Sequence, residues 1–140
     1  MGYQEISIID YINSLKNNKD YASTSAIMSS LDHRLAKMSK KNRLKALESL
    51  TENDINDINH EDSVLIAAMI EFAYNENKKN TSNKWFMSNK FTLNSIMDNS
   101  FLIYFNSYEQ KKQQAEIAIK TSAKELKWRN MVGEKVIDAM

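Results

Sequence analysis

The chain contains no proline, and its only glycines are Gly2 and Gly133. Proline and glycine are the strongest breakers of helices and the usual residues of tight hairpin turns, so a chain without them over residues 3–132 favours helices. A length of 140 residues is that of one ordinary domain, which can bury a core without disulfides or metal. We therefore expect an all-α fold over residues 1–140, a single compact bundle of about six to eight helices.

Apolar residues recur at helical spacing along most of the chain. We expect the main helices near residues 7–16, 24–37, 61–74, 92–105 and 108–130. Two shorter helices are expected after the N-terminal caps Ser39 and Thr51. The segment 61–74 is apolar around nearly its whole circumference, which predicts a core helix at the centre of the bundle, and 108–130 is the longest regular segment. For 101–105, a short aromatic and β-branched run, a strand remains an alternative.

The chain has no cysteine, which excludes a disulfide framework and a thiolate zinc site. Near the N-terminus Glu5 and Asp10 interrupt the isoleucines, so no signal peptide is expected. The longest apolar run, Val64 to Ile70, is too short to span a bilayer. These features predict a cytoplasmic protein with no membrane partner.

The net charge of +1 hides a segregated pattern. A basic run comes first, and it consists of Arg34, Lys37, Lys40, Lys41, Arg43 and Lys45. An acidic run follows without an intervening Lys or Arg, and it consists of Glu48, Glu52, Asp54, Asp57, Glu61 and Asp62. Such a pattern can guide association with a partner, and it can equally consist of solvated helix faces or internal ion pairs.

Candidate catalytic groups are few. His33 and His60 are the only histidines, and neither belongs to a familiar metal motif. The acids Asp54, Asp57, Glu61 and Asp62 would bind a divalent cation only if they converged, whereas helix N-termini collect such acids through the helix dipole. A glycine-rich phosphate loop, a serine elbow and a cysteine nucleophile are all absent from the sequence. We expect no catalytic residue, no cofactor and no metal, and hence a protein that is not an enzyme.

Aromatic residues mark the candidate partner-binding surface. Trp85 and Phe86 lie in a polar stretch, where they either anchor a loop to the core or contact a partner. Tyr108 opens the last long helical segment. The pair Arg129-Asn130 resembles the start of HEPN-type ribonuclease motifs, but the histidine required a few residues later is absent. These two side chains can also bind the carbonyl groups at the end of a helix.

Three segments resemble small helical bacterial proteins encoded beside nucleotidyltransferase-type toxins. They are Leu47 to Ala73, the pair Lys84-Trp85, and Leu126 to Val136 (LKWRNMVGEKV). In those proteins an apolar helix precedes a tryptophan loop, and an Arg-Asn pair lies near the C-terminus. The resemblance implies an antitoxin-like, partner-binding role rather than catalysis.

The leading hypothesis is a non-enzymatic protein-binding module of a bacterium, phage or mobile element, acting as an antitoxin or as an inhibitor of a partner protein. Its candidate partner-binding residues are Trp85, Phe86, Tyr108 and Arg129. The alternative is a helical nucleic-acid-binding regulator, in which Lys and Arg contact phosphates as in a helix-turn-helix. The residues of this alternative are Arg34, Lys37, Lys40, Lys41 and Arg43.

Overall fold

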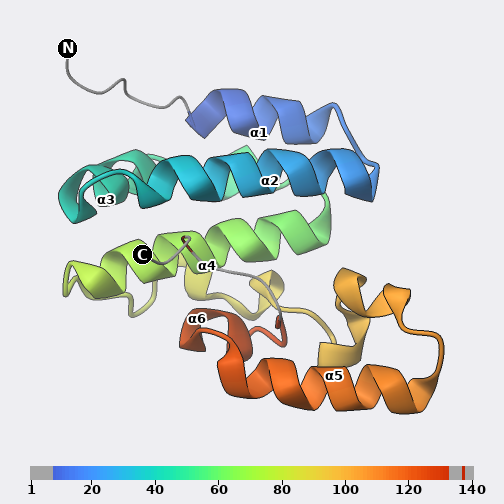
Figure 1. Cartoon of the computed structure of the whole chain (residues 1–140). Coiled ribbons are helices and arrows are strands. Elements are labelled where there is room, and N and C mark those ends of the chain that lie inside the picture. Colours follow the sequence, from blue (N-terminus) through green and yellow to red (C-terminus); the bar gives the residue numbers. More distant parts are fainter. Residues whose placement is uncertain (1–7, 133–136, 138–140) are drawn as a thin grey trace.

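The computed structural model describes residues 8–132 and residue 137. Residues 8–132 form six α-helices and five 3-10 helices, with no strand among them. The α-helices pack in successive layers from α1 at one side of the molecule to α5 at the other (Figure 1). The predicted all-α bundle is therefore confirmed, and the strand alternative for 101–105 is wrong because this segment is a 3-10 helix followed by extended residue Phe105.

The first three helices are bounded by residues that the sequence makes recognisable. Helix α1 (Ile8–Lys16) buries isoleucine and leucine at helical spacing, and residue 7 of the predicted helix 7–16 lies outside the described residues. Helix α2 (Tyr21–Ala36) begins earlier than predicted, because the Asp20 side chain accepts the Ser23 N–H at 3.0 Å and caps the helix. Helix α3 (Lys40–Glu48) begins after Ser39, whose hydroxyl accepts the Asn42 N–H as predicted.

Helix α4 (His60–Glu76) is the centre of the core. Its residues are buried on nearly every side, as expected for a helix that is apolar all round. It packs against α3, against α6, and against the 3-10 helices η2 (Trp85–Met87) and η3 (Asn89–Phe91). The short helix η1 (Glu52–Ile55), with its capping box between Thr51 and Asp54, precedes α4 as predicted. The predicted core helix near 61–74 is thus confirmed and slightly longer.

The helix predicted over 92–105 is wrong. This segment contains two short 3-10 helices, η4 (Ile96–Asp98) and η5 (Ser100–Tyr104), separated by Asn99 in an extended conformation. The Asn99 side-chain amide donates to the Ile96 carbonyl at 2.7 Å and to the Asn130 carbonyl at 2.8 Å. A side chain that binds the local backbone in this way competes with helix propagation, and asparagine does so readily.

The long helix predicted over 108–130 is divided in two. Helix α5 (Tyr108–Thr121) ends at Ser122, and the one-turn helix α6 (Lys124–Lys127) follows after Ala123. Ser122 and Ala123 are extended, and the Ser122 hydroxyl donates to the Ala118 carbonyl at 2.7 Å. The break lets α6 turn back against α4, whereas α5 packs on η4 and η5. Four buried residues here lie outside the main core cluster: Leu102, Ala115, Ala118 and Val132.

Candidate functional site

The four predicted partner-binding residues do not form one surface. Tyr108, the first residue of α5, is 68% exposed, and Trp85 is partly buried. Phe86 is only 1% exposed and Arg129 is fully buried, so neither is available to a partner on the surface. This corrects the assignment of Phe86 and Arg129 as contact residues. Both side chains are buried by contacts with α4.

Phe86 is buried because η2 packs directly on α4. Its ring lies 4.9 Å from the ring of Tyr74 on α4, measured between centroids. Trp85 packs edge-on against Phe86 at 5.7 Å and against Phe91 at 5.4 Å. Aromatic pairs at such distances contribute beyond the apolar area that they bury. The expectation that this aromatic cluster anchors the polar 75–88 stretch to the core is therefore confirmed.

Arg129 ties the C-terminal segment to the core. Its guanidinium forms an ion pair with Glu71 on α4 at 3.1 Å and donates to the Phe91 carbonyl at 2.9 Å and to the Glu125 carbonyl at 3.0 Å. Burial lowers the pKa of Arg129, and the hydrogen bond and charge of Glu71 oppose this. The Trp128 indole donates to the same Glu71 oxygen at 2.8 Å. Arg129 thus holds the C-terminal segment against the core.

Asn130 completes this arrangement. Its side-chain amide donates to the Leu93 carbonyl at 2.9 Å, and its own backbone has a positive φ of 61°. Asparagine is one of the few residues that adopt this left-handed conformation readily. The interpretation of the Arg129-Asn130 pair as a set of donors for backbone carbonyls is confirmed.

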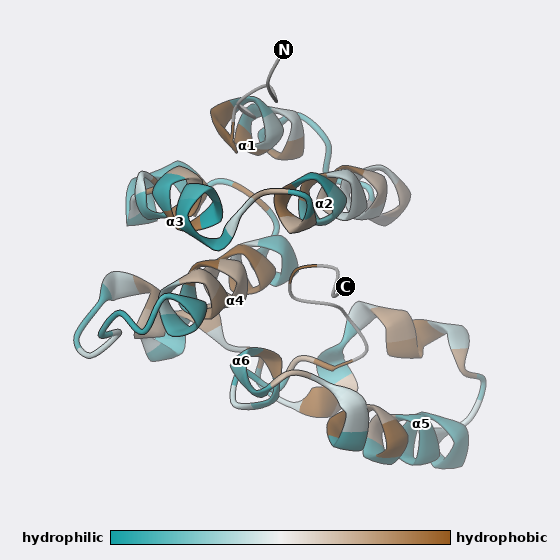
Figure 2. Cartoon of the chain, turned by 60° about the vertical axis from the view of Figure 1, so that its left-hand side comes forward, coloured by the Kyte–Doolittle hydropathy of each residue, from teal (hydrophilic) through white to brown (hydrophobic). Residues whose placement is uncertain are grey.

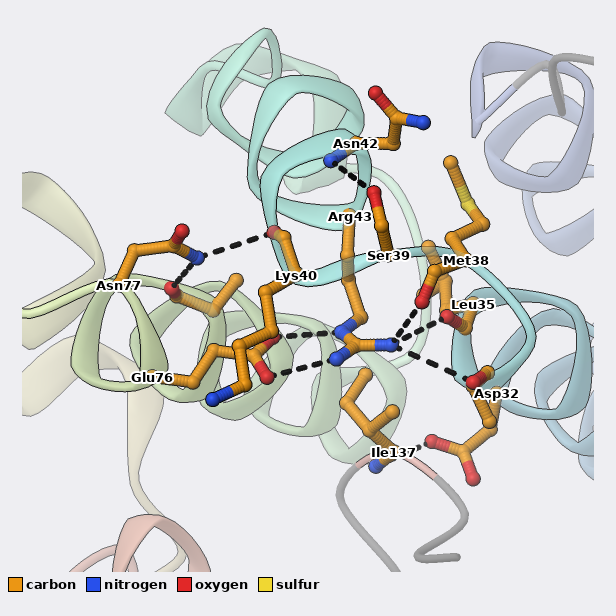
Figure 3. A network of polar contacts seen from close by, with 12 residues as sticks. Asp32, Leu35, Met38, Ser39, Lys40, Asn42, Arg43, Glu76, Asn77 and Ile137 are labelled. Atoms are coloured by element: carbon orange, nitrogen blue, oxygen red, sulfur yellow. Dashed lines mark hydrogen bonds and ion pairs between the residues drawn. The ribbon is translucent and has the colours of Figure 1, made fainter.

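The basic run separates into exposed and buried members. Arg34, Lys37, Lys40 and Lys41 are exposed around the corner between α2 and α3. Arg43 is only 3% exposed. Its guanidinium is bound to both carboxylate oxygens of Glu76, at 2.6 and 2.7 Å (Figure 3). The assignment of Arg43 as a phosphate contact is therefore corrected.

Arg43 is buried because its guanidinium binds backbone carbonyls near the end of α2. One guanidinium nitrogen donates to the Leu35 carbonyl at 2.9 Å and to the Met38 carbonyl at 2.8 Å, so it binds the backbone at and just after the end of α2. Glu76, at the end of α4, supplies the compensating charge. A bidentate pair of this kind suits arginine in particular, because its donors are fixed in a plane.

The acidic run meets lysines from the second half of the chain. Glu48 pairs with Lys79 at 2.7 Å and Glu52 pairs with Lys90 at 2.7 Å, both near the surface. Some residues of the segregated acidic run therefore form ion pairs with lysines that are distant in the sequence. Within residues 8–132 no group of three or more histidine and acidic side chains is arranged to hold a metal ion.

His60 faces a backbone group rather than a catalytic partner. Its Nε2 atom lies 2.7 Å from the Thr92 carbonyl oxygen, so this nitrogen must carry the proton. The contact joins the start of α4 to the segment that precedes η4.

Two surface features emerge only in the fold. Ile103 and Tyr104, at the end of η5, are 62% and 67% exposed, and Tyr108, at the start of α5, is 68% exposed. The second feature is a cavity of about 750 Å³ between α2, the start of α4, and the η4–η5 segment, with Ile103 at its edge.

Compared with known protein families, with curated proteins and with solved structures, the chain gives no match. No helix in the described part of the chain is long and apolar enough to cross a membrane.

Proposed function

We propose that this chain is a non-enzymatic, cytoplasmic protein-binding module of antitoxin or inhibitor type. The observation that carries the proposal is that Ile103, Tyr104 and Tyr108, which lie within six positions of the chain, are all exposed. We call these three residues the η5–α5 patch. Single exposed apolar residues are normal on a protein surface, whereas grouped ones mark interaction sites. Tyrosine in particular is enriched at the buried centre of protein interfaces.

The position of the η5–α5 patch supports the same function. The η5 helix packs on α5, and α5 lies on the side of the molecule opposite α1 (Figure 1). Hydrophobic ribbon is visible in the turns beside α5 at the edge of the molecule (Figure 2). Ile103, Tyr104 and Tyr108 belong neither to the main core cluster nor to the partly buried residues packed against it, so these exposed side chains are not needed to complete the core. The antitoxin-like character rests on the sequence resemblance, and the source would be a bacterium, phage or mobile element.

The test is a comparison of the patch variant Tyr104→Ser/Tyr108→Ser with the wild-type chain. We expect the wild-type protein to recover a stoichiometric partner from the native host and to bind that partner after separate purification. Loss of two central tyrosines should weaken this binding by about 2 kcal/mol or more, which is roughly 30-fold. Calorimetry or biolayer interferometry on the purified pair measures the effect.

The matched control is Ile9→Ser, because Ile9 is an exposed apolar residue on α1, away from the patch. This variant should bind as the wild-type protein does, and both variants should unfold within about 0.5 kcal/mol of it. A wild-type protein that purifies alone, or a partner bound equally well by the tyrosine variant, contradicts the proposal.

The exposure of Arg34, Lys37, Lys40 and Lys41 favours nucleic-acid binding as a second candidate function. Phosphate contacts make affinity fall steeply with salt, by about 0.9 in the logarithmic slope for each contact with duplex DNA. The variant Lys40→Gln/Lys41→Gln should therefore reduce the slope by about 2 in a fluorescence-anisotropy titration, whereas Lys120→Gln on α5 should leave it unchanged. Absence of duplex binding at low salt removes this candidate.

A further inference from the structure

The cavity between α2, α4 and the η4–η5 segment has the size of a ligand site. Its volume of about 750 Å³ lies within the range of roughly 300–1,000 Å³ that is typical of small-molecule pockets. Its wall includes an apolar part, made of Met28, Leu65, Ile103 and Met131. The aliphatic portion of a ligand can therefore pack against this apolar part of the wall.

The charged part of the wall is mainly acidic and comes from three elements. Among the described residues, six titratable groups face the cavity: Lys19, Asp32, His60, Glu61, Asp62 and Asp98. Three of them are already engaged, because Asp32 accepts the backbone N–H of Ile137, Lys19 donates to the Asp57 carbonyl and His60 donates to the Thr92 carbonyl. The helix dipole of α4 accounts for the location of Glu61 and Asp62, but not for Asp98 on η4.

The two acids at the start of α4 are only partly satisfied. Glu61 Oε2 and Asp62 Oδ2 are shielded from water, and within the described structure neither atom has a hydrogen-bond partner. Unpaired buried acceptors are uncommon in folded proteins and are costly when the group is charged. Burial first, and then the neighbouring charge of Glu61, raises the pKa of Asp62 to about 6. A positive charge placed in the cavity would oppose this rise in the pKa of Asp62.

We propose that this cavity binds an organic cation, in which a guanidinium or primary ammonium group lies against Glu61 and Asp62 and an aliphatic chain covers Met28 and Leu65. The cation can be a free amine or a basic side chain of a bound protein. Ile103 belongs to both the cavity and the η5–α5 patch, so the two features are contiguous and a protein bound at the patch can extend a basic side chain into the cavity. The binding site itself does not depend on the proposed function.

The experiment uses the purified full chain and two probes, agmatine and the peptide acetyl-Ala-Arg-Ala-amide, followed by calorimetry and NMR chemical-shift changes. We expect at least one probe to bind, with shift changes at residues that line the cavity. The same peptide with citrulline in place of arginine has no charge and should bind at least tenfold more weakly. Binding of agmatine alone would identify a free amine as the source, and binding of the peptide alone would identify a protein side chain.

The variants Glu61→Gln and Asp62→Asn should each weaken binding roughly tenfold, since each removes one charged contact. Both replacements nearly preserve side-chain shape, and circular dichroism verifies that both fold. The matched control is Glu116→Gln, an exposed acid on α5 that should leave binding unchanged.

The pH dependence of binding provides a second readout. The cation binds the ionised form of Asp62, so affinity should decrease as the pH falls through about 6, where this carboxyl takes up a proton. The decrease should be smaller in Asp62→Asn, which lacks this carboxyl. Three results would overturn the proposal. They are no binding of either probe at about 10 mM, equal binding of the citrulline peptide, and unchanged affinity in both acid variants. A failure here leaves the partner test at Tyr104 and Tyr108 unaffected, so the two results are separable.

Discussion

Replacing Arg129 by methionine is expected to lower the free energy of unfolding by about 3–5 kcal/mol, the usual effect of removing one partner from a buried ion pair. Glu71 would remain in the core with only the Trp128 indole as a donor from this group of contacts, and the Phe91 carbonyl would lose the bond from Arg129. An uncompensated charge in a low-dielectric interior is the main cost. Urea denaturation followed by far-UV circular dichroism measures the effect.

The control for this prediction is Arg34→Met, because Arg34 is exposed on α2. Its free energy of unfolding should change by about 0.5 kcal/mol or less. The double variant Arg129→Met/Glu71→Leu should recover part of the loss, because it removes both charges together. If Arg129→Met costs less than about 1 kcal/mol, the assignment of Arg129 as the anchor of the C-terminal segment is wrong.

The helices that could be predicted are those whose ends are determined by neighbouring residues. Ser39 and Thr51 are followed by helices because their side chains can bind the backbone of the next turn. Helix α4 could be predicted because a segment that is apolar all round must be surrounded by other elements. In each case the information lies within one short stretch of sequence.

The errors arise where a side chain binds the backbone instead of allowing the helix to continue. Ser122 ends α5, and Asn99 separates η4 from η5. Serine and asparagine also occur inside helices, so neither residue alone predicts a break. The Asn99 contact with the Asn130 carbonyl joins residues 31 positions apart, which no local pattern contains.

Among the candidate site residues, too, local features could be predicted from the sequence and long-range contacts could not. The exposure of Arg34, Lys37 and Tyr108 agrees with their sequence assignment to surfaces. The cavity could not be predicted, because its wall combines α2, α4 and the η4–η5 segment. The burial of Arg129 depends on Glu71, 58 positions away, and that of Arg43 depends on Glu76, 33 positions away. An arginine next to lysines looks like a surface charge until its carboxylate partner is located.

Replacing Arg43 by methionine is expected to have the second large effect, again about 3–5 kcal/mol of unfolding free energy. The variant leaves Glu76 partly buried without its bidentate partner and removes the donors to the Leu35 and Met38 carbonyls. High salt should change this effect little, because buried pairs are screened much less than exposed ones. Thermal and urea denaturation at low and high salt measure both quantities.

The matched controls come from the same helix and from an exposed pair. Lys41→Met should leave stability within about 0.5 kcal/mol of wild type, since Lys41 is exposed on α3. Glu48→Gln removes the exposed pair with Lys79 and should cost about 0–1 kcal/mol, with a clear dependence on salt. If Arg43→Met is as stable as Lys41→Met, the buried pair does not hold α3 against α4. If the large loss is found, weakened nucleic-acid binding in an Arg43 variant reflects lost stability. Phosphate contacts at this corner are then tested with variants of the exposed residues Arg34, Lys37, Lys40 and Lys41.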